Sequence, residues 1–199
     1  MTILELKRYF KTELSELYDD SEGAVLFGIF AYKIIGLNQF QLLKFSHQKV
    51  LESDFEDFEN LIAELKTGKP YQHILGETEF YGMSFFVNEN VLIPRPETEE
   101  LLELAIEKIS NLKSQIPNLK ILDIGTGSGV IPLVLKRYFP DAEITSIDFS
   151  EKALEIAKKN AEFHQLNIQF IHADYLNFNL IESYDIIISN PPYIGIEEE

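Results

Sequence analysis

A glycine-rich turn in the middle of the chain restricts the folds open to this sequence. Residues 121–129 read ILDIGTGSG, a short apolar run followed by a glycine at every second position. Glycine lacks a Cβ atom and tolerates positive φ angles, so the backbone can turn sharply, with N–H groups facing a ligand that approaches closely. The pattern predicts a ligand-binding turn between a strand and a helix, with a plain tight turn as the alternative.

Strand and helix patterns alternate around this turn. Apolar runs and helical periodicity predict four strands, at 120–124, 143–147, 168–171 and 184–189, and two helices between the first three, at 128–138 and 150–163. Strands that alternate with helices form parallel sheets through right-handed crossovers. The run DIIIS at 185–189 is typical of a strand covered on both faces. We therefore predict an α/β, Rossmann-like sheet.

The first 70 residues instead carry apolar residues at three- and four-residue spacing, which is typical of helices. Two capping boxes, Asn38 with Gln41 and Ser53 with Glu56, predict helix starts. A pattern of two short strands follows around Gly82. We predict a small all-helical domain at 1–70, a β-hairpin linker at 71–95 and the Rossmann-like domain at 96–199.

Composition narrows the range of partners. The 199 residues carry a net charge of −16, whereas nucleic-acid binding draws most of its affinity from lysine and arginine, so we expect no nucleic-acid partner. The chain has no cysteine, which excludes a zinc-thiolate site and favours the cytoplasm. The apolar run at 23–32 is shorter than the roughly 20 residues that a spanning helix needs, so we expect no membrane contact.

Polar residues at the ends of the predicted strands suggest a nucleoside ligand. Asp148 follows the second strand, where a carboxylate can accept both hydroxyls of a ribose, although it can equally cap the next helix. Asp174 and Tyr175 follow the third strand and can bind an adenine amine and ring. The turn lacks the Gly-x-Gly-x-x-Gly spacing of dinucleotide enzymes. The candidate ligand-binding residues are Gly125, Thr126, Gly127, Ser128, Gly129, Asp148, Asp174, Tyr175 and Asn190.

The tetrapeptide Asn190-Pro191-Pro192-Tyr193 closes the fourth predicted strand. Ligands of open α/β sheets bind beyond the carboxyl ends of the strands, so we expect Asn190 beside the turn. The Asn190 side-chain oxygen and the Pro191 carbonyl are hydrogen-bond acceptors, and the prolines hold them at a fixed spacing. Two such acceptors fit a planar NH₂ group, against which Tyr193 can stack. No metal is needed for such a site.

Three further segments precede these motifs in order, GKPYQHILG at 68–76, EFYG at 79–82 and IPRPETE at 93–99. With the glycine turn and Asn190-Pro191-Pro192-Tyr193, they resemble the release factor glutamine N5-methyltransferases, the PrmC/HemK family, over nearly the whole chain. The resemblance implies S-adenosylmethionine as cofactor, contacted by residues 125–129, Asp148 and Tyr175. It also implies methylation of the glutamine N5 atom in the Gly-Gly-Gln motif of class I release factors, which the helical domain helps to recognise. We expect a cytoplasmic monomer.

Two other functions fit part of this pattern. Adenine-N6 nucleic-acid methyltransferases share the Asn-Pro-Pro-Tyr motif, but they must extrude a base and grip phosphates, which the acidic charge disfavours. The sheet of the resembled family continues beyond four strands, so we also expect the chain to be C-terminally truncated. In that case it would be a poorly stable fragment that binds S-adenosylmethionine without turnover, because its fourth strand would have an open edge.

Overall fold

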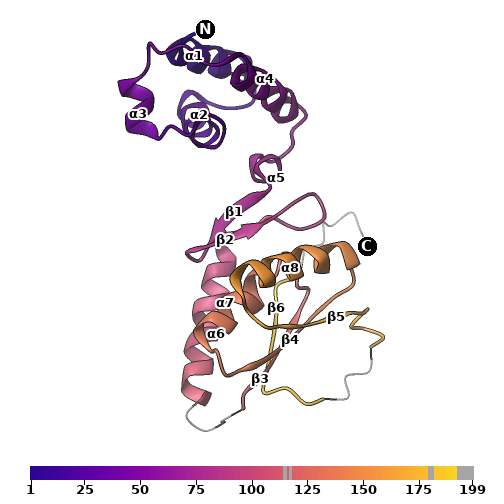
Figure 1. Cartoon of the computed structure of the whole chain (residues 1–199). Helices are drawn as coiled ribbons and strands as arrows, with labels where there is room; N and C mark the ends of the chain where they lie inside the picture. Colours follow the sequence, from indigo (N-terminus) through magenta and orange to yellow (C-terminus); the bar gives the residue numbers. More distant parts are fainter. Residues whose placement is uncertain (114–115, 117, 179–181, 192–199) are drawn as a thin grey trace. The chain divides into compact units, whose positions relative to one another are not determined.

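The computed structural model describes residues 1–113, 116, 118–178 and 182–191 (Figure 1). The chain divides into two compact units, Met1–Ile74 and Leu75–Glu199. None of the helices in the described part of the chain is long and apolar enough to cross a membrane. Pro192 and Tyr193 lie outside the described residues.

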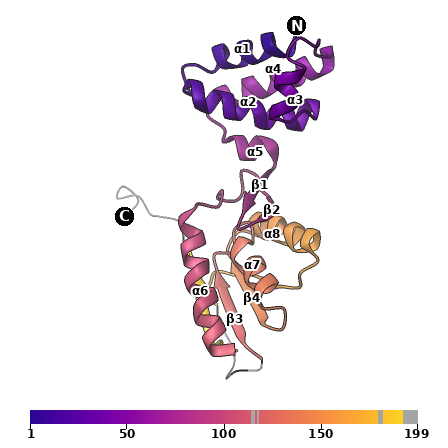
Figure 2. The same ribbon diagram turned by 90° about the vertical axis from the view of Figure 1, so that its left-hand side faces the viewer.

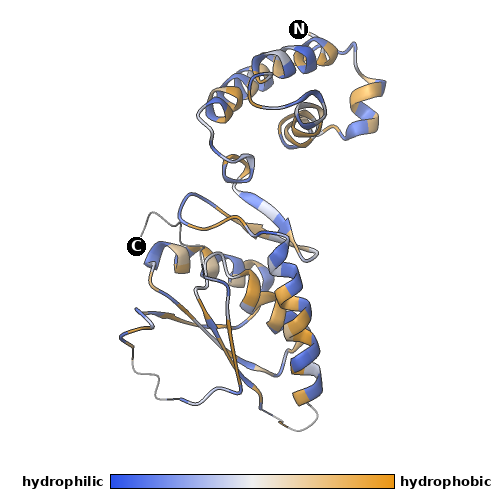
Figure 3. Cartoon of the chain, turned by 180° about the vertical axis from the view of Figure 1, so that it is seen from behind, coloured by the Kyte–Doolittle hydropathy of each residue, from blue (hydrophilic) through white to orange (hydrophobic). Residues whose placement is uncertain are grey.

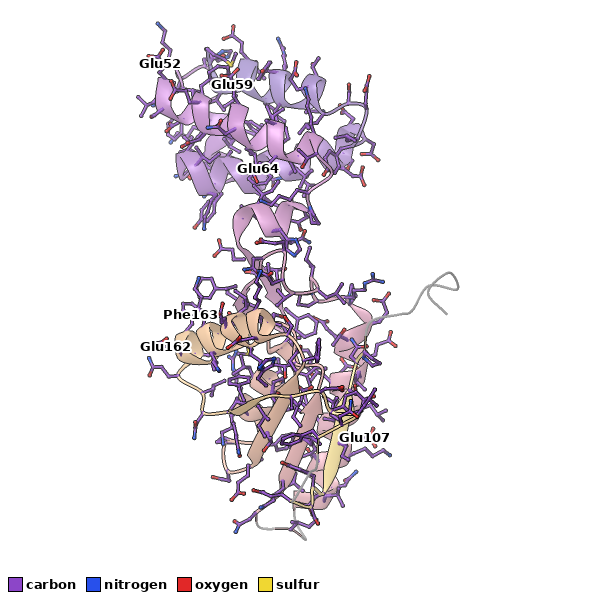
Figure 4. All side chains as sticks on the ribbon, turned by 90° about the vertical axis from the view of Figure 1, so that its right-hand side faces the viewer. Glu52, Glu59, Glu64, Glu107, Glu162 and Phe163 are labelled. Carbon is purple, nitrogen blue, oxygen red and sulfur yellow. The ribbon has the colours of Figure 1, made fainter. Side chains whose placement is uncertain are left out.

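The first unit consists of helices, as predicted. Its main helices are α1 (Ile3–Glu13), α2 (Asp20–Ile35), α3 (Gln39–Lys44) and α4 (Glu52–Lys66) (Figure 2). Their apolar faces meet in an aromatic core in which the ring centroids of Phe10, Phe27 and Phe58 lie 5.6–6.1 Å apart. Acidic side chains, among them Glu59 and Glu64, cover the outer side of α4 (Figure 4). The apolar periodicity of the sequence thus corresponds to a buried helical core.

Two helix starts in this unit were predicted from capping boxes. The Asn38 side chain accepts a hydrogen bond from the Gln41 N–H at 3.0 Å, and the Gln41 side chain accepts one from the Asn38 N–H, so this prediction is confirmed. The Ser53 prediction is wrong, because α4 begins two residues earlier, after Leu51, which makes no side-chain cap bond. With Ser53 already inside the first turn, its hydroxyl cannot take the capping position.

A short helix and a hairpin follow. Helix α5 (Tyr71–Leu75) occupies the first residues that we assigned to the hairpin linker. Strands β1 (Glu77–Phe80) and β2 (Met83–Phe86) then pair antiparallel, and both turn residues have positive φ, 50° at Tyr81 and 67° at Gly82. Such a turn matches the twist of the two strands. The hairpin belongs to the second unit and buries Phe85 in its core.

The rest of the second unit is a parallel sheet with helices. Its strands, in the spatial order β5-β4-β3-β6, are β3 (Lys120–Ile124), β4 (Glu143–Asp148), β5 (Gln169–His172) and β6 (Ile186–Ser189). The connecting helices are α6 (Glu97–Lys113), α7 (Val130–Tyr138) and α8 (Glu151–His164). Hydrophobic residues line the strands and α7 (Figure 3). The predicted α/β sheet is therefore confirmed, including the pairing of its first and fourth strands, β3 and β6.

One detail of β6 differs from the prediction. Ile188 is buried, but Ile187 on the opposite face of the strand is 61% exposed. The apolar run therefore does not correspond to a strand covered on both faces by the described residues. An apolar run shows only that its side chains can be buried. Whether they are buried depends on the elements that pack against the strand.

We expect replacement of Phe58 by alanine to lower the free energy of unfolding by about 3–5 kcal/mol, because Phe58 is fully buried in the helical core. Phe40→Ala is the matched control, since this ring is 72% exposed, and it should change the free energy by less than about 0.5 kcal/mol. Urea denaturation followed by far-ultraviolet circular dichroism measures both. Equal losses in the two variants would contradict the assignment of the core.

Candidate active site

The glycine-rich turn connects β3 to α7, as predicted. Gly125, Gly127 and Gly129 have φ angles of 83°, 54° and 84°, which residues other than glycine rarely adopt. A Cβ atom at Gly129 would lie 3.2 Å from the Ala157 Cβ atom, so this glycine lets α8 pack on the turn. At Gly125 and Gly127 a Cβ atom would meet nothing within 4 Å. The outer side of the turn is therefore open to a ligand.

The N–H groups of the turn are largely occupied. Those of Gly125 and Thr126 donate to the Ile147 carbonyl at 2.9 and 3.2 Å, and that of Gly129 donates to the Thr126 carbonyl. The Gly127 N–H donates to Asp148 Oδ2 at 2.8 Å. The expectation of outward-facing N–H groups is therefore wrong for these four, since β4 and the turn itself accept their hydrogens. The side chains of Thr126 and Ser128 are buried, so only their backbone atoms can meet a ligand.

Asp148 ends β4 and braces this turn. Besides the Gly127 N–H, its carboxylate accepts the Ser150 N–H through Oδ1 at 2.8 Å. Each carboxylate oxygen has two lone pairs, so both oxygens can accept one further hydrogen bond. The two roles considered for Asp148, support of the next helix and acceptance of a ligand's hydroxyl groups, are therefore compatible.

Asp174 and Tyr175 follow β5 at the same edge of the sheet. The Ala173 N–H donates to the Asp148 carbonyl at 3.1 Å, so this segment adjoins the end of β4. The Asp174 carboxylate accepts the Leu176 N–H and the Asn177 side-chain amide, and the Tyr175 side chain is exposed. The structure thus brings the turn, Asp148 and these two residues to one edge.

Asn190 directly follows β6, next to the start of the turn. Ser189 pairs with Ile124, the residue before Gly125, and its hydroxyl donates to the Ile124 carbonyl at 2.8 Å. Nδ2 of Asn190 donates to Thr98 Oγ1 at 2.8 Å. Because the amide nitrogen faces Thr98, the acceptor Oδ1 points to the other side of the group.

A buried carboxyl group, which sequence analysis did not single out, lies behind the turn. Asp123 is fully buried, and its Oδ2 accepts a hydrogen bond from the Ser146 hydroxyl, which in turn lies 2.5 Å from the Thr126 hydroxyl. Among the described residues, Oδ1 of Asp123 has no hydrogen-bond partner. Burial in this apolar setting raises the pKa of Asp123 to about 7. The sequence signal for this buried carboxyl group was an acidic residue within the apolar run ILDI.

Comparison with known proteins identifies the family. Residues 5–76 match the family model for the PrmC N-terminal domain, and residues 106–198 match that for the methyltransferase small domain. The release factor glutamine methyltransferase of Flavobacterium psychrophilum is 43% identical over 196 residues, which cover 98% of this chain and 68% of that protein. This chain belongs to the release factor glutamine methyltransferase family. The resemblance inferred from the motifs is therefore confirmed.

Two further proteins are similar to this chain. The release factor glutamine methyltransferase of Streptococcus pneumoniae is 39% identical over 201 residues, covering 100% of this chain and 68% of that protein. The solved structure of M. jannaschii TYW2 in complex with AdoMet aligns with a TM-score of 0.46 and 19% identity, over 56% of this chain and 50% of that chain.

Asn160 is a second residue that sequence analysis missed. Its side chain is fully buried on α8, where Nδ2 donates to the Ser128 carbonyl at 2.8 Å and to the Phe86 carbonyl at 3.0 Å. Its Oδ1 accepts the Phe86 N–H at 2.7 Å. One amide therefore joins the helix, the glycine turn and the hairpin of this methyltransferase-family chain. A polar residue among the apolar helix positions Ala157 and Ala161 was the available signal.

We expect the stability contribution of Asp123 to depend on pH. Its pKa is about 7 in the folded chain, against roughly 3.9 for an exposed aspartate, so folding retains a proton that the unfolded chain loses above about pH 4. The contribution of Asp123 to the free energy of unfolding therefore falls as the pH rises from about 4 to 7, and it levels off above that range.

The comparison with Asp123→Asn isolates this effect. The difference in free energy of unfolding, native protein minus variant, should decrease by a few kcal/mol between about pH 4 and pH 7. Urea titrations across this range measure it. A difference that stays constant with pH would mean that Asp123 is already ionised in the folded chain.

Proposed function

We propose that this protein transfers the methyl group of S-adenosylmethionine to the N5 atom of the glutamine in the Gly-Gly-Gln motif of class I release factors. The position of Asn190 carries the proposal, since its Nδ2 is bound to Thr98 and the residue lies beside an open glycine turn. The relatives named release factor glutamine methyltransferase support this choice of substrate. Release factors act on ribosomes, so we place the reaction in the cytoplasm. We further propose a monomer without nucleic-acid or membrane partners.

The residues at the sheet edge fit this cofactor. The open side of Gly125 and Gly127 admits the nucleoside, the free lone pairs of Asp148 suit its ribose hydroxyls, and the exposed Tyr175 ring suits the adenine face. The cofactor supplies an electrophilic methyl group bonded to a sulfonium. The occupied N–H groups of the turn disfavour a pyrophosphate, so a dinucleotide fits less well.

The chain's own part in the reaction is orientation. An amide nitrogen is a poor nucleophile because its lone pair is delocalised into the carbonyl group. On this proposal Asn190 Oδ1 and the Pro191 carbonyl accept the two hydrogens of the glutamine NH₂ group, which raises the electron density on its nitrogen and aims it at the methyl carbon. The bound cofactor would supply the methyl group and would leave as S-adenosylhomocysteine, and the glutamine nitrogen would lose one hydrogen as a proton to water. Such orientation can lower a barrier by roughly 7–11 kcal/mol.

The direct test is methyl transfer from radiolabelled cofactor to a class I release factor. We expect labelling of the native factor and none of a factor whose Gly-Gly-Gln glutamine is replaced by alanine. Asn190→Ala should lower kcat about 100-fold, since the amide then lacks one of its two acceptors. Labelling of DNA or RNA without labelling of the factor would instead support an adenine-N6 methyltransferase. Cofactor binding without any transfer would support a non-catalytic binding protein.

We expect Asp148→Asn to weaken cofactor binding about 10- to 100-fold, because an amide cannot accept both the Gly127 N–H and two ribose hydroxyls. Asp185→Asn is the matched control. Its Oδ2 also accepts a backbone N–H, from Lys120 at 2.8 Å, but at the opposite end of β3. Calorimetric titration with S-adenosylhomocysteine compares them, and equal affinities in the two variants would argue against the role of Asp148.

A further inference from the structure

We propose that Thr98 is a positioning residue for Asn190, and that the segment from the hairpin to the start of α6 forms part of the active-site scaffold. This inference rests on the proposed function, because Asn190 is the group that receives the glutamine amide. It concerns a residue 92 positions away in sequence. The sequence predicts only a β-hairpin linker at 71–95.

The contact between the two side chains is direct and sheltered. Thr98 is 4% exposed, and its Oγ1 accepts the Asn190 Nδ2 hydrogen at 2.8 Å. Asn190 directly follows β6, whose pairing with β3 ends at Ser189. The Thr98 hydroxyl therefore gives the Asn190 side chain a hydrogen-bond partner outside the sheet.

The orientation of the Asn190 amide decides whether the site can work. A hydroxyl group can donate or accept, so Thr98 could in principle bind either end of an amide. A glutamine NH₂ group needs an oxygen acceptor, and only one orientation of Asn190 presents it. In the structure Nδ2 is the atom bound to Thr98, which leaves Oδ1 for the substrate. The arrangement is thus the productive one.

The first turn of α6 is itself anchored. The Thr98 N–H donates to the Arg95 carbonyl at 3.0 Å, and the neighbouring Glu99 carboxylate accepts the Tyr81 N–H at 3.1 Å. Tyr81 lies in the tight turn of the hairpin, and its hydrogen bond to Glu99 holds this turn beside the start of α6. The start of α6 is therefore held at two points, and Thr98, which lies in it, keeps its position.

The same hairpin reaches the other half of the site. Strand β2 is bound through Phe86 to Asn160, which also holds the Ser128 carbonyl of the glycine turn. The Phe163 ring packs edge-on against Phe86 with centroids 5.2 Å apart (Figure 4). The hairpin thus connects the group that receives the substrate with the turn that receives the cofactor. The hydrogen bonds of Thr98, Glu99 and Asn160, joined by the backbone of the hairpin and of α6, thus run from Asn190 to the glycine turn.

The test compares Thr98→Val, which removes the hydroxyl but keeps the shape, with Thr98→Ser, which keeps the hydroxyl. Thr145→Val is the matched control, because Thr145 is also a buried threonine whose hydroxyl makes a side-chain hydrogen bond, to Gln169 at 3.4 Å. We expect Thr98→Val to lower kcat for release factor methylation about 10- to 100-fold. Cofactor affinity should stay within about twofold, and Thr98→Ser should restore kcat to within about threefold.

Three results would overturn the proposal. One is a Thr98→Val variant with unchanged kcat, and another is a Thr98→Ser variant as slow as Thr98→Val. A fall in melting temperature and cofactor affinity as large as that in kcat, beyond that of Thr145→Val, would assign Thr98 a purely structural role and would equally overturn it.

A second measurement separates this proposal from the proposed function. Hydrogen exchange of the Asn190 side-chain NH₂ group, followed by nuclear magnetic resonance, needs no turnover. Slow exchange in the native chain and Thr98→Ser, with fast exchange in Thr98→Val, supports the positioning contact even if the release factor is not methylated. Equal exchange in all three refutes the contact whatever the activity.

Discussion

The buried amide of Asn160 is the interaction on which the arrangement of the second unit depends. It makes three hydrogen bonds, one to the Ser128 carbonyl and two to the backbone of Phe86. Leaving a buried donor or acceptor unpaired costs about 1–3 kcal/mol, so an apolar residue here would leave three backbone groups without partners. A side chain with only a donor or only an acceptor cannot satisfy both the N–H and the carbonyl groups. Asparagine at this position therefore fixes the hairpin against the glycine turn.

This coupling explains why the hairpin is built into the second unit. Phe80, Met83 and Phe85 enter the same apolar core as the sheet, so the hairpin is held by burial as well as by Asn160. Its far end, at Tyr81, holds Glu99 and thereby the start of α6. Rigid elements place functional groups more accurately than loops do. The site thus uses a hairpin that is remote in sequence to align residues 125–129 with Asn190.

Local sequence patterns were sufficient to predict most helices and strands, but they did not predict the contacts between them. The strand ILDI, the glycine turn and the Asn38–Gln41 box are each contained within a few residues, and each was predicted from sequence. The Ser53 box failed because α4 begins two residues earlier, after Leu51, and helix α5 was missed because its five residues carry no apolar periodicity. Asn160 and Thr98 act across 74 and 92 residues, and such distances leave no periodic trace.

The geometry at Asn190 also limits what the motif can decide. An oxygen acceptor held by Thr98 binds any planar NH₂ group, whether of glutamine or of adenine, so the tetrapeptide does not select the substrate. Selection must therefore come from surfaces around the site. We propose that the net charge of the chain, with 33 acidic and 17 basic residues, disfavours a phosphate backbone and favours a protein loop as the substrate. On this proposal the motif binds the reacting NH₂ group, and the charge of the chain favours the macromolecule that presents it.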